Sequence, residues 1–149
     1  MKMKKKIVLM LVVIMIVSSL HITVSAADGT SNEIQPYLSN IYSYTVDFDI
    51  TSTGFASVYF SYEGDPDFFE SATTEIYLEK RFLGIFWTRV DIGETDNVWV
   101  DAFYEDYGYV DHTLQLEKTG TYRATFKMTF TGTNTTADVL EKTVEATYG

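Results

Sequence analysis

Apolar and polar residues alternate along most of the chain after residue 40. The alternation is clearest from Leu114 to Phe130, where even-numbered positions are mainly apolar or aromatic and odd-numbered positions are polar. A period of two is typical of a β-strand that buries one of its faces. Lys118, Thr119 and Gly120 interrupt the pattern, so this stretch predicts two antiparallel strands joined by a tight turn.

Tyr122 follows the turn glycine by two residues and stands at the start of the second of these strands. Its position resembles the tyrosine corner of immunoglobulin-like sandwiches, in which the tyrosine hydroxyl bonds to backbone a few residues upstream. The simpler alternative is a core tyrosine whose hydroxyl contacts water. We expect the corner, because both the turn and the parity fit it.

The same alternation predicts the other strands. A hairpin is expected over 42–63 with its turn at Thr53-Gly54, and no helical period follows the N-terminal segment. Further strands are expected at 73–82, 86–92, 97–104, 113–118, 121–131 and 138–148, of which 97–104 is the weakest. Seven or eight short strands at regular spacing predict an all-β, antiparallel β-sandwich of the immunoglobulin-like or fibronectin-like kind.

The N-terminus has the features of a helical secretory signal peptide. Four lysines among the first six residues precede eleven apolar residues at 7–17, and small residues surround Ala26. Polar residues interrupt the apolar run before it reaches the length of a membrane span. We therefore expect a signal peptide at 1–26, a flexible lead-in at 27–40 and a domain at 41–149. An uncleaved N-terminal anchor is the alternative to a protein secreted into the extracellular medium.

Charge and cysteine content limit the function classes. Cleavage of the signal would leave seven basic residues against all 21 acidic ones, a net charge of −14. Such a surface repels nucleic acid, although solubility in the extracellular medium is the simpler explanation of the charge. The chain contains no cysteine, which excludes disulfides, thiolate zinc sites and cysteine nucleophiles.

The sequence offers little for catalysis. His112 is the only histidine after the signal, and its neighbour Asp111 points to the opposite face of a strand. A hydrolytic triad needs a histidine that contacts both an acid and a nucleophile, so we do not expect an enzyme. A pair of carboxylates could still serve a small glycosidase, which stays as a second alternative.

Acidic loops are expected to share one end of the sandwich. With 97–104 inside a long crossing connection, the loops 63–72, 93–112 and 132–137 would meet there and, together with Asp138 beside the last loop, carry 11 of the 21 acids. Calcium takes six to eight oxygen ligands from such loops. The candidate ligands are Asp65, Asp67, Glu70, Asp96 and Asp106. A solvated acidic end without calcium is the alternative, and no other cofactor is expected.

Aromatic residues accompany these acids. Tyr104, Tyr107 and Tyr109 are expected beside polar groups, as in platforms that bind sugar rings or a protein partner. Phe68 and Phe69 lie in the same loops and are expected to cover the end of the core.

The opposite end is expected to carry an apolar hairpin tip with a cationic surround. The apolar residues are Phe82, Leu83, Ile85, Phe86 and Trp87, and the cations are Lys80, Arg81, Arg89, Lys118 and Arg123, five of the seven basic residues after the signal. Such a tip suits docking onto a protein, onto a second copy or onto an anionic surface. Packing of Phe82, Phe86 and Trp87 beneath the sheet edge is the alternative.

Several short segments together resemble a known group of proteins. They are Ile34-Gln35-Pro36, Tyr44-Thr45, Tyr77-Leu78-Glu79-Lys80 leading to Trp87-Thr88-Arg89-Val90, and Gly120-Thr121-Tyr122-Arg123. In these the chain resembles short Sec-exported proteins of Gram-positive bacteria, a family of uncharacterised function. The resemblance implies a bacterial, exported β-sandwich and no activity or site residues. The chain departs from it in the apolar segment 82–86 and in its more acidic loops.

These observations predict a secreted, non-enzymatic binding or interaction module that acts at the cell surface or in the medium. A carbohydrate-binding or calcium-stabilised module is the first alternative. The expected partner is a protein, a glycan or another part of the cell envelope. Nucleic acid is not expected as a partner, nor is a membrane span after cleavage.

Overall fold

The strands of the protein are described in a computed structural model that covers residues 38–133 and 135–149. The predicted signal peptide and most of the predicted lead-in lie outside these residues. In chain order the elements are β1 (Ile41–Ile50), β2 (Phe55–Gly64), β3 (Phe69–Phe82), β4 (Phe86–Arg89), the 3-10 helix η1 (Thr95–Asn97), β5 (Trp99–Phe103), β6 (Tyr107–Gln115), β7 (Gly120–Gly132) and β8 (Asp138–Tyr148). Among the described residues, no helix is long and apolar enough to span a membrane.

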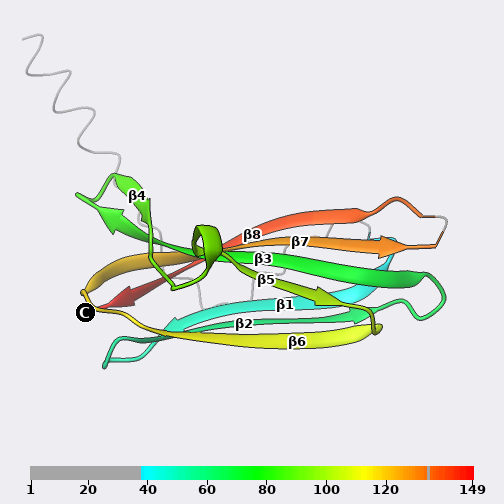
Figure 1. The fold of residues 1–149 in the computed structure, drawn as a ribbon, viewed down its shortest axis with the longest axis horizontal. Helices are drawn as coiled ribbons and strands as arrows, with labels where there is room; N and C mark the ends of the chain where they lie inside the picture. Colours follow the sequence, from blue (N-terminus) through cyan, green and yellow to red (C-terminus); the bar gives the residue numbers. More distant parts are fainter. Residues whose placement is uncertain (1–37, 134) are drawn as a thin grey trace, which may run out of the picture. The chain divides into compact units, whose positions relative to one another are not determined.

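Two antiparallel sheets pack face to face (Figure 1). One sheet has the order β1-β2-β6 and the other has the order β4-β3-β7-β8, with β5 also paired to β3. β4 pairs with the C-terminal part of β3, while β5 pairs with its N-terminal part. The predicted all-β, antiparallel sandwich is therefore confirmed.

The strands on either side of the 118–120 turn belong to different sheets. β6 pairs with β2, whereas β7 pairs with β3 and β8. The turn is thus a crossing between layers and not a hairpin, a distinction that parity alone cannot make. The predicted tyrosine corner is confirmed at this crossing, because the buried Tyr122 hydroxyl donates a hydrogen bond to the Lys118 carbonyl.

Several strand boundaries differ from the prediction. β6 already begins at Tyr107 in a stretch that the sequence predicted as loop, and the weakly supported strand near 97–104 forms as β5. β4 ends at Arg89, three residues before its predicted end. At the N-terminal boundary Asn40 is fully buried. Its amide group donates to the carbonyls of Phe130 and Thr136, so the ordered domain starts before Ile41.

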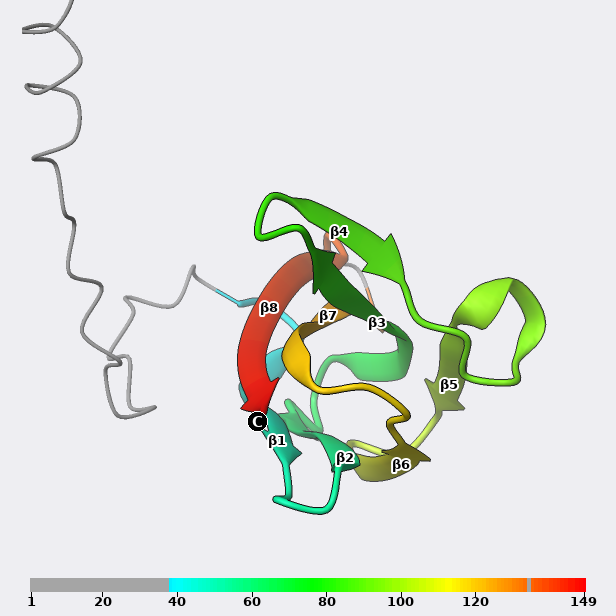
Figure 2. The same ribbon diagram turned by 90° about the vertical axis from the view of Figure 1, so that its left-hand side faces the viewer.

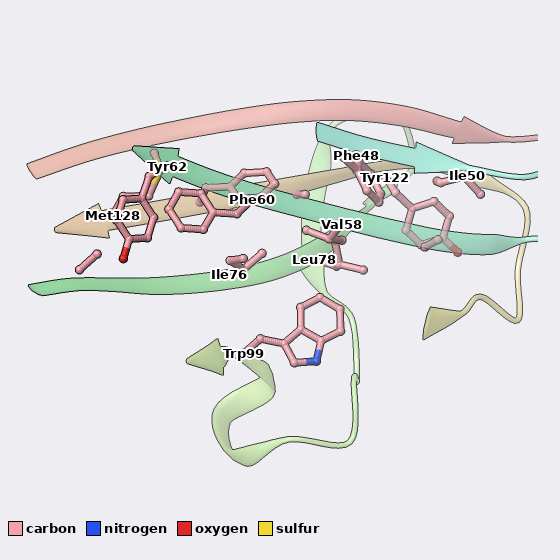
Figure 3. Packing of buried hydrophobic residues seen from close by; sticks show 14 of the residues in the cluster. Phe48, Ile50, Val58, Phe60, Tyr62, Ile76, Leu78, Trp99, Tyr122 and Met128 are labelled. Atoms are coloured by element: carbon pink, nitrogen blue, oxygen red, sulfur yellow. The ribbon is translucent and has the colours of Figure 1, made fainter. Parts of the chain in front are cut away.

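The core lies between the inward faces of the two sheets (Figure 3). Phe60 and Tyr62 of β2 face Phe130 of β7 at ring-centroid distances of 6.4 and 5.5 Å. Phe60, Phe126 and Phe130 have no exposed surface. Each fully buried aromatic side chain stabilises the fold by about 1.5–3 kcal/mol through burial, so this aromatic cluster holds the two layers together.

Candidate functional site

The hairpin of β3 and β4 projects from one end of the sandwich (Figures 1 and 2). Phe82 pairs with Phe86, and the Ile85 N–H donates to the Phe82 carbonyl at 3.1 Å. Leu83 and Gly84 have φ values of 51° and 70°. Positive φ at both central residues is typical of the tight hairpin turns that favour asparagine and glycine. Leucine there is strained by about 1 kcal/mol, which points to a role for its side chain outside the fold.

The apolar side chains of this tip contact solvent. Phe82, Leu83, Ile85 and Phe86 are 58%, 74%, 73% and 61% exposed. Packing beneath the sheet edge, the alternative considered for Phe82 and Phe86, is therefore wrong. Contiguous exposed apolar residues are a common feature of interaction sites. We call these four residues the apolar tip.

Trp87 behaves differently from the apolar tip. It is only partly exposed, and the guanidinium groups of Arg81 and Arg123 lie over its ring at 5.8 and 4.3 Å from the centroid. Cation–π contacts of this kind hold both partners in place. Trp87 therefore anchors the base of the hairpin on the outer face of the sheet.

Cations surround the base of the hairpin on both faces. On the outer face, the Arg123 Nε donates to Glu79 at 2.7 Å, and the Arg89 guanidinium lies 3.5 Å from the Tyr77 ring centroid. On the inner side, the Lys80 ammonium lies 5.5 Å from the Tyr122 ring centroid. The Arg81 Nε donates to the Gly84 carbonyl at 2.8 Å, so this cation also braces the turn.

A groove runs between the inner side of the hairpin and the tyrosine corner. It has a volume of about 790 Å³ and opens to solvent. Apolar side chains from both sheets line it, and Lys80 and Lys118 stand beside them; the apolar members are Phe82, Val90, Ile92, Leu114 and Leu116. The groove thus places Lys118 near Lys80, as the prediction of a cationic surround requires.

The acidic loops meet at the other end of the sandwich, as predicted, but they are shorter. The Gly64 N–H donates to the Asp106 carbonyl at 2.5 Å, and the Thr133 N–H donates to the Phe68 carbonyl at 2.7 Å. These bonds join the β2–β3, β5–β6 and β7–β8 connections. The acids that gather there include Glu63, Asp65, Asp67, Glu70, Glu105 and Asp106.

The predicted calcium site does not form as a single group. Asp96 lies in η1, on the β4–β5 connection, and not in the three loops that meet. The Asp65 carboxylate accepts the Asp67 N–H at 3.0 Å, and Glu70 accepts the Thr133 hydroxyl at 3.1 Å. Within residues 38–133 and 135–149, no three acids or histidines come together as metal ligands. Asp96 lies apart from the other candidates because β5 divides the expected loop 93–112.

The predicted tyrosines at this end are exposed. Tyr104, Tyr107 and Tyr109 are 79%, 69% and 71% exposed. Tyr107 and Tyr109 lie on the outer face of β6, where Tyr109 pairs with Ser61 and is the diagonal neighbour of Tyr59. Tyr59 was not among the candidate residues, although its odd position in β2 already placed it on the outer face.

His112 links β5 to β6. Its Nε2 lies 2.7 Å from a carboxylate oxygen of Asp101, and its ring stacks on buried Trp99 at 4.9 Å. Asp111 faces away and accepts the Ser57 hydroxyl at 2.9 Å. The contacts seen for His112 are thus with an acid and an indole rather than with a nucleophile, and they close one side of the sandwich.

Tyr62 makes the stability of the acidic end depend on pH. Burial, together with the charges of Asp106 and Glu105, raises the pKa of its hydroxyl from 10.0 to about 12. The unfolded chain therefore loses this proton first. The contribution of the protonated Tyr62 hydroxyl to the free energy of unfolding is fully present below pH 10 and is lost as the pH rises toward 12.

Urea unfolding between pH 10 and 12 tests this assignment. The free energy of unfolding should fall steeply with pH for the wild type and less steeply for Tyr62→Phe. Equal slopes would contradict the assignment to Tyr62.

The sequence comparisons add no family to this description. No protein-family model matches the chain, and a search of curated proteins finds no similar sequence.

Proposed function

We propose that this protein is a secreted, non-enzymatic binding module that docks through the apolar tip of the β3–β4 hairpin. The observation that carries the proposal is the exposure of Phe82, Leu83, Ile85 and Phe86, each more than half exposed to solvent. Burying one such side chain against a partner gains about 1.5–3 kcal/mol. Four of them on one projecting turn therefore supply a large part of the free energy that docking needs to offset the entropy lost on association.

Two further features support docking at this end. The turn holds Leu83 at positive φ, where glycine or asparagine would be unstrained, so a leucine at this position is better explained by a partner than by the fold. Arg81 and Arg123 both contact the ring of Trp87, which stiffens the base of the hairpin. A stiff base lowers the entropy lost on binding. The signal-like N-terminus agrees with action outside the cell.

The double variant Leu83→Asp with Ile85→Asp tests this proposal. We expect it to lower association with the cell envelope by about a hundredfold or more, because two apolar side chains that would be buried against the partner are replaced by charged ones. Its melting temperature should stay close to that of the wild type, since both residues are about three-quarters exposed. The measurement is the fraction of protein bound to isolated envelopes.

Val100→Asp with Val139→Asp is the matched control. These valines are 68% and 71% exposed and lie in β5 and β8, outside the apolar tip. The control introduces the same two charges and should bind like the wild type. Equal loss in both double variants would show that charge, and not the tip, determines association, and the proposal would fail.

A carbohydrate-binding module is the second candidate function. The exposed tyrosines Tyr59, Tyr107 and Tyr109 form a strip on the outer face of the β1-β2-β6 sheet, and such rings stack on sugars. A glycan array would test it, with Tyr107→Ala and Tyr109→Ala as the variants that should lose binding.

A further inference from the structure

We propose that the apolar tip inserts into the interface of an anionic lipid bilayer. This inference rests on the proposed docking function and names the partner as a membrane surface. Its basis is the order in which apolar, aromatic and cationic side chains follow one another along the hairpin.

The strand register divides the hairpin into layers. Leu83 and Ile85 stand at the turn, and the pair Phe82–Phe86 follows directly behind them. The next pair is Arg81–Trp87, and behind it comes Lys80 opposite Thr88. Arg89 opposite Glu79, and Arg123 beside Glu79 on β7, complete the cationic level. Polarity therefore increases in steps from the tip toward the sandwich.

A bilayer surface shows the same order from inside to outside. Apolar side chains enter the acyl boundary, tryptophan prefers the interface, and lysine and arginine lie among anionic head groups. At about 3.3–3.4 Å per residue, the Arg81–Trp87 pair lies roughly 7 Å behind the turn. Interfacial elements bury their apolar part to about 5–10 Å. The tip therefore reaches the depth at which its cations meet the phosphates.

Basic residues are concentrated at the same end of the domain, where they outnumber the neighbouring acids Glu79, Asp91 and Glu117. Five of the seven basic residues after the predicted signal surround the hairpin base, whereas the acidic loops meet at the far end of β7. β7 has 13 residues, so the two ends are separated by about 40 Å. The Debye length at physiological salt is about 8 Å. An anionic surface that contacts the hairpin is thus screened from the acidic loops despite the net negative charge.

The layered order favours a membrane over a protein pocket. In a protein interface, a polar rim surrounds an apolar centre within the plane of the interface. Here the cations stand behind the apolar residues along the axis of the hairpin, on both of its faces. A planar partner whose polarity changes with depth matches this arrangement.

Vesicle binding by the exported protein tests the proposal. Vesicles of phosphatidylcholine alone are compared with vesicles that contain phosphatidylcholine and phosphatidylglycerol in equal parts, by co-sedimentation and tryptophan emission. We expect at least tenfold tighter binding to the anionic vesicles, weakened by salt, with a blue shift from Trp87, since Trp99 is already buried. Lys80→Gln with Lys118→Gln should lower binding severalfold on anionic vesicles only.

Every variant keeps the same N-terminus, so differences in binding between variants are due to the substituted residues. The tip variants therefore distinguish failure of the lipid inference from failure of the docking function. Leu83→Asp with Ile85→Asp should lose anionic-vesicle binding by about a hundredfold, while Val100→Asp with Val139→Asp should keep it. No vesicle binding, or equal binding to both vesicle types, overturns the lipid inference. If envelope association still depends on the tip in that case, the partner is a protein or wall polymer and the docking function stands. If envelope association is also independent of the tip, both proposals fall.

Discussion

Replacement of Phe126 by alanine is expected to lower the free energy of unfolding by about 3–5 kcal/mol. Phe126 lies in β7, between β3 and β8 in the sheet order, and has no exposed surface. The substitution removes buried apolar area and leaves a cavity that the neighbouring strands cannot close. Because domains are typically stable by only about 5–15 kcal/mol, this is a large part of the total.

The melting temperature should fall by about 10–20 °C as a result, and calorimetry or denaturant unfolding would measure both quantities. Phe86→Ala is the matched control, because it makes the same change at a strand position that is 61% exposed. Its effect on unfolding should stay within about 0.5 kcal/mol. Similar losses at both positions would contradict the assignment of Phe126 to the core and of Phe86 to the apolar tip.

Replacement of Gly132 by alanine is expected to destabilise the domain by about 2–3 kcal/mol through overpacking. A β-carbon at this position would lie 2.6 Å from the Phe68 carbonyl oxygen and would also strike the Asn40 side chain. Neither neighbour can move freely. The Phe68 carbonyl accepts the Thr133 N–H at 2.7 Å, and Asn40 is held by the carbonyls of Phe130 and Thr136.

Thermal unfolding and the amide exchange rates around Asn40 would measure this effect. Gly149→Ala serves as control, since a β-carbon there would have no atom within 4 Å. The Gly149 variant should unfold like the wild type. A neutral Gly132 variant would show that the β2–β3 and β7–β8 connections are not tightly joined at this end.

The candidate sites differ in how much of each could be predicted from the sequence. The apolar tip was predictable, because a large apolar residue beside Gly84 in a turn is unusual, and basic residues cluster in the neighbouring sequence. Its exposure was not, since Phe82 has the same parity as the core residues Ile76 and Leu78 of β3, and Phe86 of β4 pairs with Phe82. Only the projection of the hairpin beyond the sandwich separates the two pairs.

The expected grouping of the calcium candidates differs from the observed one for a related reason. Acidic residues were counted by the loop in which they were expected, but β5 and the early start of β6 convert most of 93–112 into paired backbone. Asp101 contacts His112 as a consequence. Such a pairing across elements has no signal in local periodicity.

Local residue order was sufficient for most of the strands, for the inward face of those that alternate clearly and for the corner at Tyr122, because side chains of a strand alternate strictly and a turn needs particular residues. The sheet to which each strand belongs, the contact of His112 with Asp101 and the exposure of the apolar tip required the folded arrangement. Both sheets bury the same kind of face, so alternation cannot tell one from the other, and exposure depends on where neighbouring strands end.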